Sequence, residues 1–284
     1  MRSSLPALFF TNEMDTQRAY PSVFVYGIAG SGKTNLYRTL IAPARVTKKI
    51  CMTYPPLVLA TEDGQTKGMS TLGDLRVPAI LLNKLDELLA VAAELSAHAK
   101  PGEIYYQGQG PFGGVGLDSL TGVGPMLERA AAILKGWSSG MIWDVGPGQK
   151  KDPRSAYPYI AEKGREIVRK LMSLPVPLIM MCREQIITEG EGPAAVSYPA
   201  PELPGQKLPR ELPGWPEATV RIRMINGKRV LQTENEGQVV ARVRLREGLR
   251  LPKYAHADLG ALIRLLQGDE SAIKDLTEDG KSVT

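Results

Sequence analysis

The sequence has few cysteines and few histidines. Cys51 and Cys182 are far apart in a chain of 284 residues and show no CxxC or Cys/His spacing. This pattern excludes a disulfide framework and a zinc framework, so we expect a reducing, cytoplasmic environment. His98 and His256 fall on helix-like segments without a partner pattern. We therefore expect neither histidine to bind a metal or to transfer protons.

Long apolar runs are also absent. No window reaches the ~18 uninterrupted apolar residues that a membrane-spanning helix needs. Residues 1–15 carry one Arg and a very short apolar patch, which predicts no signal peptide. The apolar share of 43% and the charged share of 23% are ordinary for a globular protein. We expect a sizeable core, in one large domain or two small ones, and no membrane partner.

The charges are mildly basic in sum and uneven in distribution. Lys and Arg number 35 against 30 Asp and Glu, which gives a formal net charge of +5. Residues 210–250 are rich in arginine, whereas the tail after Gly268 is acid-rich. A basic sheet with an acidic tail favours contact with nucleic acid, although a solvated charged face would give the same pattern.

Strand-like and helix-like patterns alternate along the first part of the chain. Apolar runs predict strands at residues 22–26, 57–60, 78–82, 113–118 and 176–182. Helical spacing predicts helices from Lys33 to before Pro43, from Leu85 to before Pro101, and over residues 124–135, 157–174 and 258–266. This alternation predicts an α/β fold with a mainly parallel sheet flanked by helices.

The C-terminal part predicts antiparallel strands. Residues 190–216 contain seven prolines, so we expect no regular element there. Asn226-Gly227 predicts a hairpin of residues 219–225 and 228–233. Alternation over residues 238–246 predicts a strand with Arg242, Arg244 and Arg246 on one face. The domain expected is residues 22–268, after an N-terminal segment 1–21 and before a flexible tail, 269–284.

Residues Gly27 to Thr34, GIAGSGKT, match the phosphate-binding P-loop pattern. The glycines let backbone N–H groups turn toward phosphates at a helix N-terminus. Lys33 is expected to reach the β- and γ-phosphates, and the Thr34 hydroxyl is expected to bind Mg²⁺. The sequence therefore predicts ATP and Mg²⁺ as ligands, with nucleotide contacts from Gly27, Ala29, Gly30, Ser31, Gly32, Lys33, Thr34 and Asn35.

Two further strands end in carboxylates. Asp118, in GVGLDSLTG, is the candidate to hold Mg²⁺ through water. Glu62, in LATEDG, is the candidate to orient or deprotonate the attacking water, with Asp63 as the alternative.

The order of P-loop, TEDG and LDSLTG, followed by a strand that ends near Arg183, resembles the RecA-like ATPase core. It is most similar to the compact phage single-strand annealing and recombination ATPases, over Val23 to Leu266. The resemblance implies ATP hydrolysis in a ring or filament, in the host cytoplasm if the protein is viral. It also implies that Arg242 and Arg244 act as a basic pair on the γ-phosphate of the neighbouring subunit.

Two segments correspond to the DNA-binding loops of that family. Residues 135–159 interleave aromatic and cationic side chains, which suits single-stranded DNA, and residues 184–216 form the second loop. The candidate DNA contacts are Trp137, Lys150, Lys151, Arg154, Lys207 and Arg210. Cys182-Arg183 departs from the family, which often has a polar γ-phosphate sensor there, and Arg183 is a candidate substitute.

We therefore expect a homo-oligomeric ATPase that binds single-stranded DNA, with a single-strand-binding protein as a further candidate partner. Phe9-Phe10 would contact an adjacent subunit or pack on its own domain. The first alternative is an assembly or packaging ring ATPase without annealing activity. The second is a small-molecule kinase, but its candidate lid, residues 190–216, has one Arg and seven prolines.

Overall fold

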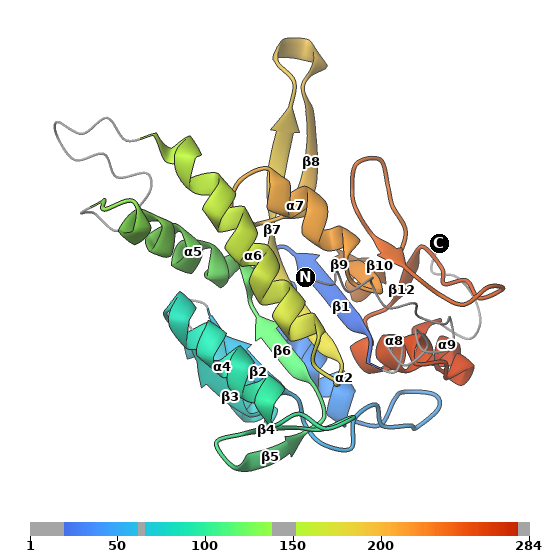
Figure 1. Ribbon diagram of the computed structural model, residues 1–284. Helices are drawn as coiled ribbons and strands as arrows, with labels where there is room; N and C mark the ends of the chain where they lie inside the picture. Colours follow the sequence, from blue (N-terminus) through green and yellow to red (C-terminus); the bar gives the residue numbers. More distant parts are fainter. Residues whose placement is uncertain (1–19, 62–65, 138–151, 278–284) are drawn as a thin grey trace, which may run out of the picture.

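The computed structural model describes residues 20–61, 66–137 and 152–277. They form an α/β fold around a large, mostly parallel mixed sheet with helices on both faces (Figure 1). The strand order is β12-β10-β9-β1-β7-β6-β2-β3, with β8 paired to β7 and β11 paired to β9. No helix in these described ranges is long and apolar enough to cross a membrane.

The parallel strands place their carboxyl ends along one edge of the sheet. They are β1 (Ser22–Gly27), β2 (Leu57–Ala60), β3 (Ala79–Leu81), β6 (Val115–Asp118), β7 (Leu178–Glu189) and β9 (Ala218–Ile225). The antiparallel additions are β8 (Val196–Pro201), β10 (Lys228–Gln232), β11 (Arg242–Val243) and β12 (Tyr254–His256). A separate two-stranded sheet contains β4 (Ile104–Tyr106) and β5 (Gln109–Phe112).

The alternation of strand residues divides the core between the two faces of the sheet. In β1, Phe24 and Tyr26 belong to one buried cluster, and Val23 and Val25 belong to the other. The first cluster lies under α4 (Leu85–Ala97), α5 (Leu120–Leu134), α6 (Tyr157–Met172) and α7 (Lys207–Glu211). The second lies under the turn η2 (Thr34–Tyr37), α2 (Arg38–Ile41), α3 (Thr66–Asp74), α8 (Leu259–Leu266) and α9 (Ile273–Leu276).

The Pro-rich segment is more regular than its sequence predicts. Strand β7 continues to Glu189 instead of ending at Cys182, and β8 folds back on it as a hairpin that projects from the body (Figure 1). The expectation that residues 190–216 hold no regular element is therefore wrong. Pro199 and Pro201 are tolerated because β8 pairs on one side only, so their missing N–H groups break no second ladder.

The strand expected over residues 238–246 shrinks to Arg242–Val243. The preceding residues turn instead, because Gly237 has a φ of +58° and the Asn235 side chain accepts a hydrogen bond from Ala241 N at 2.9 Å. The hairpin around Asn226-Gly227, by contrast, is confirmed as β9 and β10, with both turn residues at positive φ.

The acidic tail was expected to be flexible from residue 269, and this is wrong for residues 269–277. A short turn and α9 follow α8, and Leu276 and the Asp275 side chain are buried. Asp275 pairs with Arg264 of α8 at 2.7 Å. The apolar residues of this turn therefore extend the core, and the unassigned tail begins at residue 278. The N-terminal segment 1–19, with Phe9-Phe10, lies outside the described residues.

Candidate nucleotide site

The P-loop connects β1 to η2 at the carboxyl edge of the sheet. Gly30 and Gly32 have φ values of +76° and +89°, a region that residues with a side chain rarely adopt. A Cβ on Gly27 would lie 2.6 Å from Cγ2 of Ile222 in β9. The shape of the loop and its packing against β9 therefore require glycine at these positions.

Two polar side chains of the loop are arranged to receive an anion. Lys33 Nζ donates hydrogen bonds to the carbonyl oxygens of Gly27 at 2.8 Å and Ile28 at 3.0 Å. The Ser31 hydroxyl is buried and has no hydrogen-bond partner among the described residues. Such a group is costly unless it is paired. The residues present therefore fit a phosphate, which would accept from Ser31 and attract Lys33. Ala29 and Asn35, the other predicted contacts, are exposed to solvent.

The two predicted Mg²⁺ residues meet. Thr34 Oγ1 donates a hydrogen bond to Asp118 Oδ2 at 2.8 Å, across 84 residues of sequence. Asp118 ends β6, which lies between β2 and β7. No group of three His, Cys, Asp or Glu residues forms a cluster in the part of the chain that the structure describes. This hydroxyl and carboxylate fit an Mg²⁺ ion that would bind Thr34 directly and Asp118 through water, with phosphates and water as its further ligands.

Thr61 fixes the end of β2 beside Asp118. Its hydroxyl donates to the carbonyl oxygen of Ser119 and accepts from Ser119 N, and Thr61 N donates to the carbonyl oxygen of Asp118 at 3.0 Å. Glu62 and Asp63, the candidates for activating water, follow directly but lie outside the described residues. Thr61 was not predicted from the sequence, although its position directly before Glu62 could have indicated that it belongs to the site.

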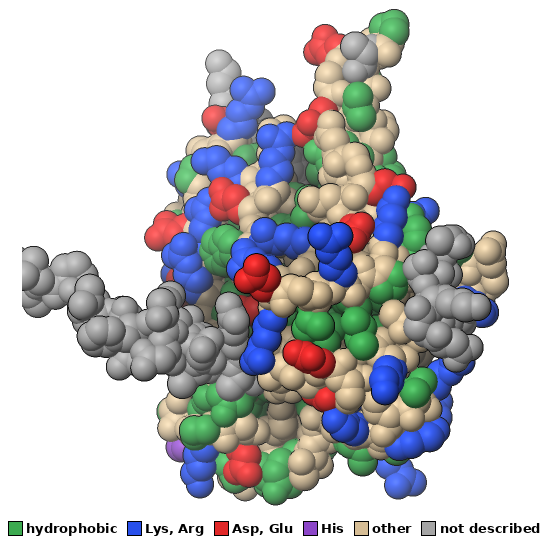
Figure 2. Space-filling view, turned by 90° about the vertical axis from the view of Figure 1, so that its right-hand side faces the viewer, with side chains coloured by type: hydrophobic (Ala, Val, Ile, Leu, Met, Phe, Trp, Pro, Cys, Tyr) green, Lys and Arg blue, Asp and Glu red, His purple; other side chains and the backbone are tan. Residues whose placement is uncertain are grey.

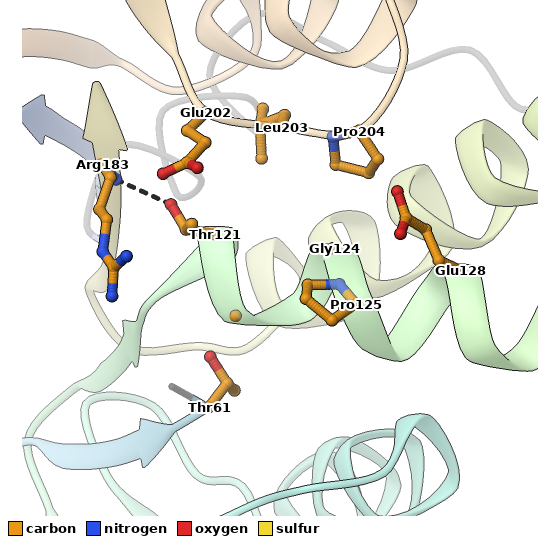
Figure 3. A pocket seen from close by; sticks show the side chains of 10 residues that line it. Thr61, Thr121, Gly124, Pro125, Glu128, Arg183, Glu202, Leu203 and Pro204 are labelled. Carbon is orange, nitrogen blue, oxygen red and sulfur yellow. Dashed lines mark hydrogen bonds between the residues drawn. The ribbon is translucent and has the colours of Figure 1, made fainter. Parts of the chain in front are cut away.

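A pocket of about 400 Å³ opens at the same edge (Figure 3). Its lining includes Thr121, Glu128, Arg183 and Glu202, brought from α5, β7 and the segment after β8. Arg183 pairs in register with Gly27, so the pocket adjoins the P-loop. The Thr121 hydroxyl accepts a hydrogen bond from Arg183 N at 2.8 Å. Sequence analysis did not identify Thr121 or Glu202.

Cys182, before Arg183 at the expected sensor position, is buried. Burial raises the pKa of its thiol to about 12, against smaller lowering effects from Thr121 and Lys33. The thiol therefore stays protonated at neutral pH and offers no anion to the site.

Arg242 and Arg244 lie toward the other edge of the sheet. Strand β11 pairs with the first residues of β9, and the guanidinium groups of both arginines donate to the carbonyl oxygen of Gly214. Burial, and then the nearby Arg244, lower the pKa of Arg242, and its buried Nε has no partner among the described residues. Arg244 also lines a cavity of about 850 Å³ with Arg169 and Trp215. The structure does not bring this pair to the P-loop of its own chain.

The candidate DNA residues fall into four groups. Arg154 and Lys207, from the two separate loops, line one pocket of about 460 Å³ together with Tyr157. Arg210 is instead paired with Glu189 of the β7–β8 hairpin, and Trp137 is partly buried against the core. Lys150 and Lys151 lie outside the described residues.

Some arginines of the arginine-rich stretch form ion pairs within the chain. Arg221 forms two hydrogen bonds with the carboxylate of Glu184, at 2.6 and 2.8 Å, and Arg223 lies 3.5 Å from Glu236. Figure 2 shows cationic and acidic side chains interspersed over this side of the molecule. The expected basic sheet is therefore not a uniform cationic face.

The sequence matches no protein-family model, and a comparison with curated proteins finds no relative.

Proposed function

We propose that the protein is a RecA-like ATPase that oligomerises and binds single-stranded DNA to promote annealing or homologous recombination. The observation that carries the ATPase assignment is the contact of Thr34 with Asp118 beside the P-loop. A hydroxyl directly after the P-loop lysine and a carboxylate at the end of another parallel strand are the pair that P-loop phosphoryl-transfer sites use for Mg²⁺.

Each residue of the site has a defined task in this proposal. Lys33 would exchange its two carbonyl partners for phosphate oxygens, and the backbone N–H groups of residues 32–34 would donate to them. Thr34 would hold Mg²⁺ directly and Asp118 would hold it through water; the ion would supply positive charge against the phosphates. Glu62 would direct water at the γ-phosphate, while Thr61 keeps the end of β2 beside Asp118.

The basic pair completes the site from a neighbouring subunit. Arg242 and Arg244 converge on one carbonyl oxygen, and neither forms an ion pair with a carboxylate of the described residues. Two guanidinium groups held this way suit the developing charge of phosphoryl transfer. Because they lie away from their own P-loop, they would act on the nucleotide of the next subunit, in a ring or a filament.

The DNA assignment rests on the pocket shared by Arg154, Tyr157 and Lys207. A pocket with an aromatic ring and two cations suits single strands, because bases stack on the ring and phosphates meet the charges. The internal pairing of Arg210, Arg221 and Arg223 instead favours the alternative, a ring ATPase without DNA affinity.

A binding assay separates these two functions. Fluorescent oligo(dT) is titrated with and without ATP at two salt concentrations, and we expect salt-sensitive binding. Replacing both Arg154 and Lys207 with Ala should weaken it, whereas the control, Lys100→Ala with Lys170→Ala, removes two charges elsewhere. Nucleotide-dependent assembly without oligo(dT) binding would support the ring ATPase and refute the DNA proposal.

A further inference from the structure

Arg229 contacts the P-loop from a part of the chain that the motif does not include. It lies in β10, whose partner β9 runs beside β1. Its Nε donates a hydrogen bond to the carbonyl oxygen of Ser31 at 3.1 Å, across 198 residues of sequence. The β9–β10 hairpin therefore forms a wall of the loop, with Ile222 against Gly27 and Arg229 against the following turn.

The absence of a side chain at Gly32 leaves space for the Arg229 guanidinium group. A Cβ on Gly32 would lie 2.7 Å from Nε and 2.9 Å from Cζ of Arg229, closer than atoms pack. The φ of +89° at Gly32 independently disfavours a side chain. The glycine before Lys33 therefore serves the loop's turn and also makes room for the guanidinium group.

The hydrogen bond of Arg229 fixes one peptide unit. In a trans peptide the C=O and the N–H point in opposite directions. Because Arg229 holds the Ser31 carbonyl oxygen toward the β9–β10 hairpin, the Gly32 N–H points away from the hairpin. That N–H makes no backbone hydrogen bond in the described part of the chain, so it remains a donor for a ligand.

We propose that Arg229 is a positioning residue that orients the Gly32 N–H for a phosphate oxygen of the bound nucleotide. The proposal rests on the nucleotide-binding function proposed above. Without the guanidinium group, the Ser31–Gly32 peptide is free to rotate, and the donor must be ordered again each time a nucleotide binds. Nucleotide affinity would then depend on the β9–β10 hairpin as well as on Lys33.

The test compares wild-type protein, Arg229→Ala, Arg229→Lys and the control Lys228→Ala. Lys228 precedes Arg229 in β10, so its side chain leaves the opposite face of the strand while its removal changes the net charge equally. Titration with a fluorescent ATP analogue should give roughly tenfold weaker binding for Arg229→Ala, the size expected for a charge-assisted hydrogen bond. Arg229→Lys, which keeps a cationic donor, should recover part of the affinity, and Lys228→Ala should bind like the wild type.

A second measurement separates positioning from general stability. Protein labelled with ¹⁵N-glycine reports the Gly32 amide by NMR, and ADP should shift that signal in the wild type. In Arg229→Ala the free-state signal should be broadened or moved, while the thermal midpoint and the other glycine signals stay near wild type. If Arg229→Ala does not fold, the same readouts apply to Arg229→Lys and Arg229→Gln.

The outcomes are distinct. Wild-type affinity in the folded Arg229 variants, or an equal loss in Lys228→Ala, overturns the positioning role but leaves the nucleotide site standing. If wild-type protein binds neither ATP nor ADP, the proposed function is refuted and the inference with it.

Discussion

At the scale of single residues, Gly116, two residues before Asp118, allows close packing because it has no side chain. A Cβ on Gly116 would lie 2.4 Å from the Tyr37 hydroxyl oxygen. Tyr37 belongs to the turn after the P-loop and is fully buried. Burial, and then the nearby Asp118, raise its pKa well above the ordinary value. The glycine-rich approach to Asp118 thus lets the turn after the P-loop pack directly against β6.

The Tyr37 hydroxyl has no hydrogen-bond partner among the described residues, which gives a stability prediction. Tyr37→Phe removes an unpaired buried polar group, so we expect unchanged stability or a gain of up to about 1 kcal/mol. Tyr26→Phe is the matched comparison, because the equally buried Tyr26 donates to the carbonyl oxygen of Val240 at 2.9 Å. It should lose about 1 kcal/mol. Urea unfolding measures both, and an equal loss in the two variants would contradict this account.

Substitutions of Lys33 and Asp118 test the proposed ATP hydrolysis. Lys33→Ala removes the cation of the P-loop, and Asp118→Asn removes the charge that faces Thr34. Each should lower the rate of ATP hydrolysis by on the order of 10²-fold or more, because charge stabilisation in the transition state is lost. Phosphate release is the measurement, with Lys100→Ala as the control. Unchanged turnover in Lys33→Ala would refute the P-loop assignment.

At the scale of elements, the local sequence pattern was sufficient to predict the strands in the parallel, buried part of the sheet. The strands ending at Gly27, Ala60 and Asp118 lie where their apolar runs predict them. The contact of Thr34 with Asp118 follows from that topology, because β1 and β6 are parallel strands on either side of β7 and both end at the same edge of the sheet. The β7–β8 hairpin was not predictable, because its order comes from pairing and from contacts such as Arg210 with Glu189. Glu202, which depends on that hairpin, was missed for the same reason.

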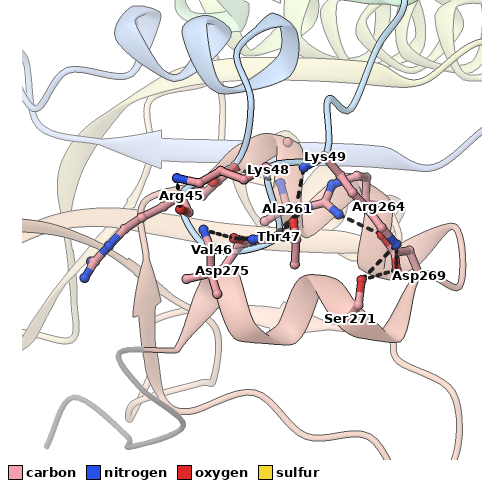
Figure 4. Close-up of polar contacts among 12 residues, drawn as sticks. Arg45, Val46, Thr47, Lys48, Lys49, Ala261, Arg264, Asp269, Ser271 and Asp275 are labelled. Atoms are coloured by element: carbon pink, nitrogen blue, oxygen red, sulfur yellow. Dashed lines mark hydrogen bonds and ion pairs between the residues drawn. The ribbon is translucent and has the colours of Figure 1, made fainter.

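The C-terminal elements form a clamp on the loop that follows α2, seen in Figure 4. Asp275 accepts hydrogen bonds from Val46 N and Thr47 N and pairs with Arg264. Asp269 pairs with Arg264 and Lys49. These contacts join α8 and the residues that follow it to the segment after α2, which the acidic composition of the tail did not indicate.

The clamp predicts a loss of stability in acid. Burial opposes the ionisation of Asp269, but hydrogen bonds from Ser271, Lys49 and Arg264 outweigh it and lower its pKa to about 2. The pKa of Asp275 is lowered as well, by bonds from Thr47, Val46 and Arg264 that outweigh its burial. A lowered carboxyl pKa contributes stability above the unfolded value of about 4, and this is lost as the pH falls toward the folded value.

Unfolding midpoints measured between pH 7 and pH 2 test this prediction. The wild type should lose stability below about pH 4, and Asp269→Asn should be less stable at pH 7 but show a flatter decline. Asp86→Asn, which alters an exposed carboxylate on α4, is the control. Parallel pH curves for the wild type and Asp269→Asn would contradict the assignment.

At the scale of the whole molecule, the two groups of residues assigned to the proposed ATPase site lie toward opposite edges of the sheet. The P-loop, Thr34 and Asp118 lie at the carboxyl edge of the sheet. Arg242 pairs in register with Thr219, near the start of β9, and Arg244 lies farther toward the amino edge, where its N–H reaches the carbonyl oxygen of Glu217 at 2.9 Å. A head-to-tail assembly would bring the basic edge of one subunit to the nucleotide edge of the next.

Mixing two inactive variants tests this arrangement. Lys33→Ala subunits keep the arginines, and subunits with both Arg242→Ala and Arg244→Ala keep the P-loop. Each variant alone should hydrolyse little ATP, because every interface lacks one half. In a random 1:1 mixture, about a quarter of head-to-tail interfaces combine an intact P-loop with intact arginines, so activity should return to about a quarter of wild type.

Arg246→Ala, which removes an exposed arginine two residues further on, is the control and should be active alone. A mixture that stays inactive, although light scattering shows that it assembles, would mean that Arg242 and Arg244 serve only their own subunit.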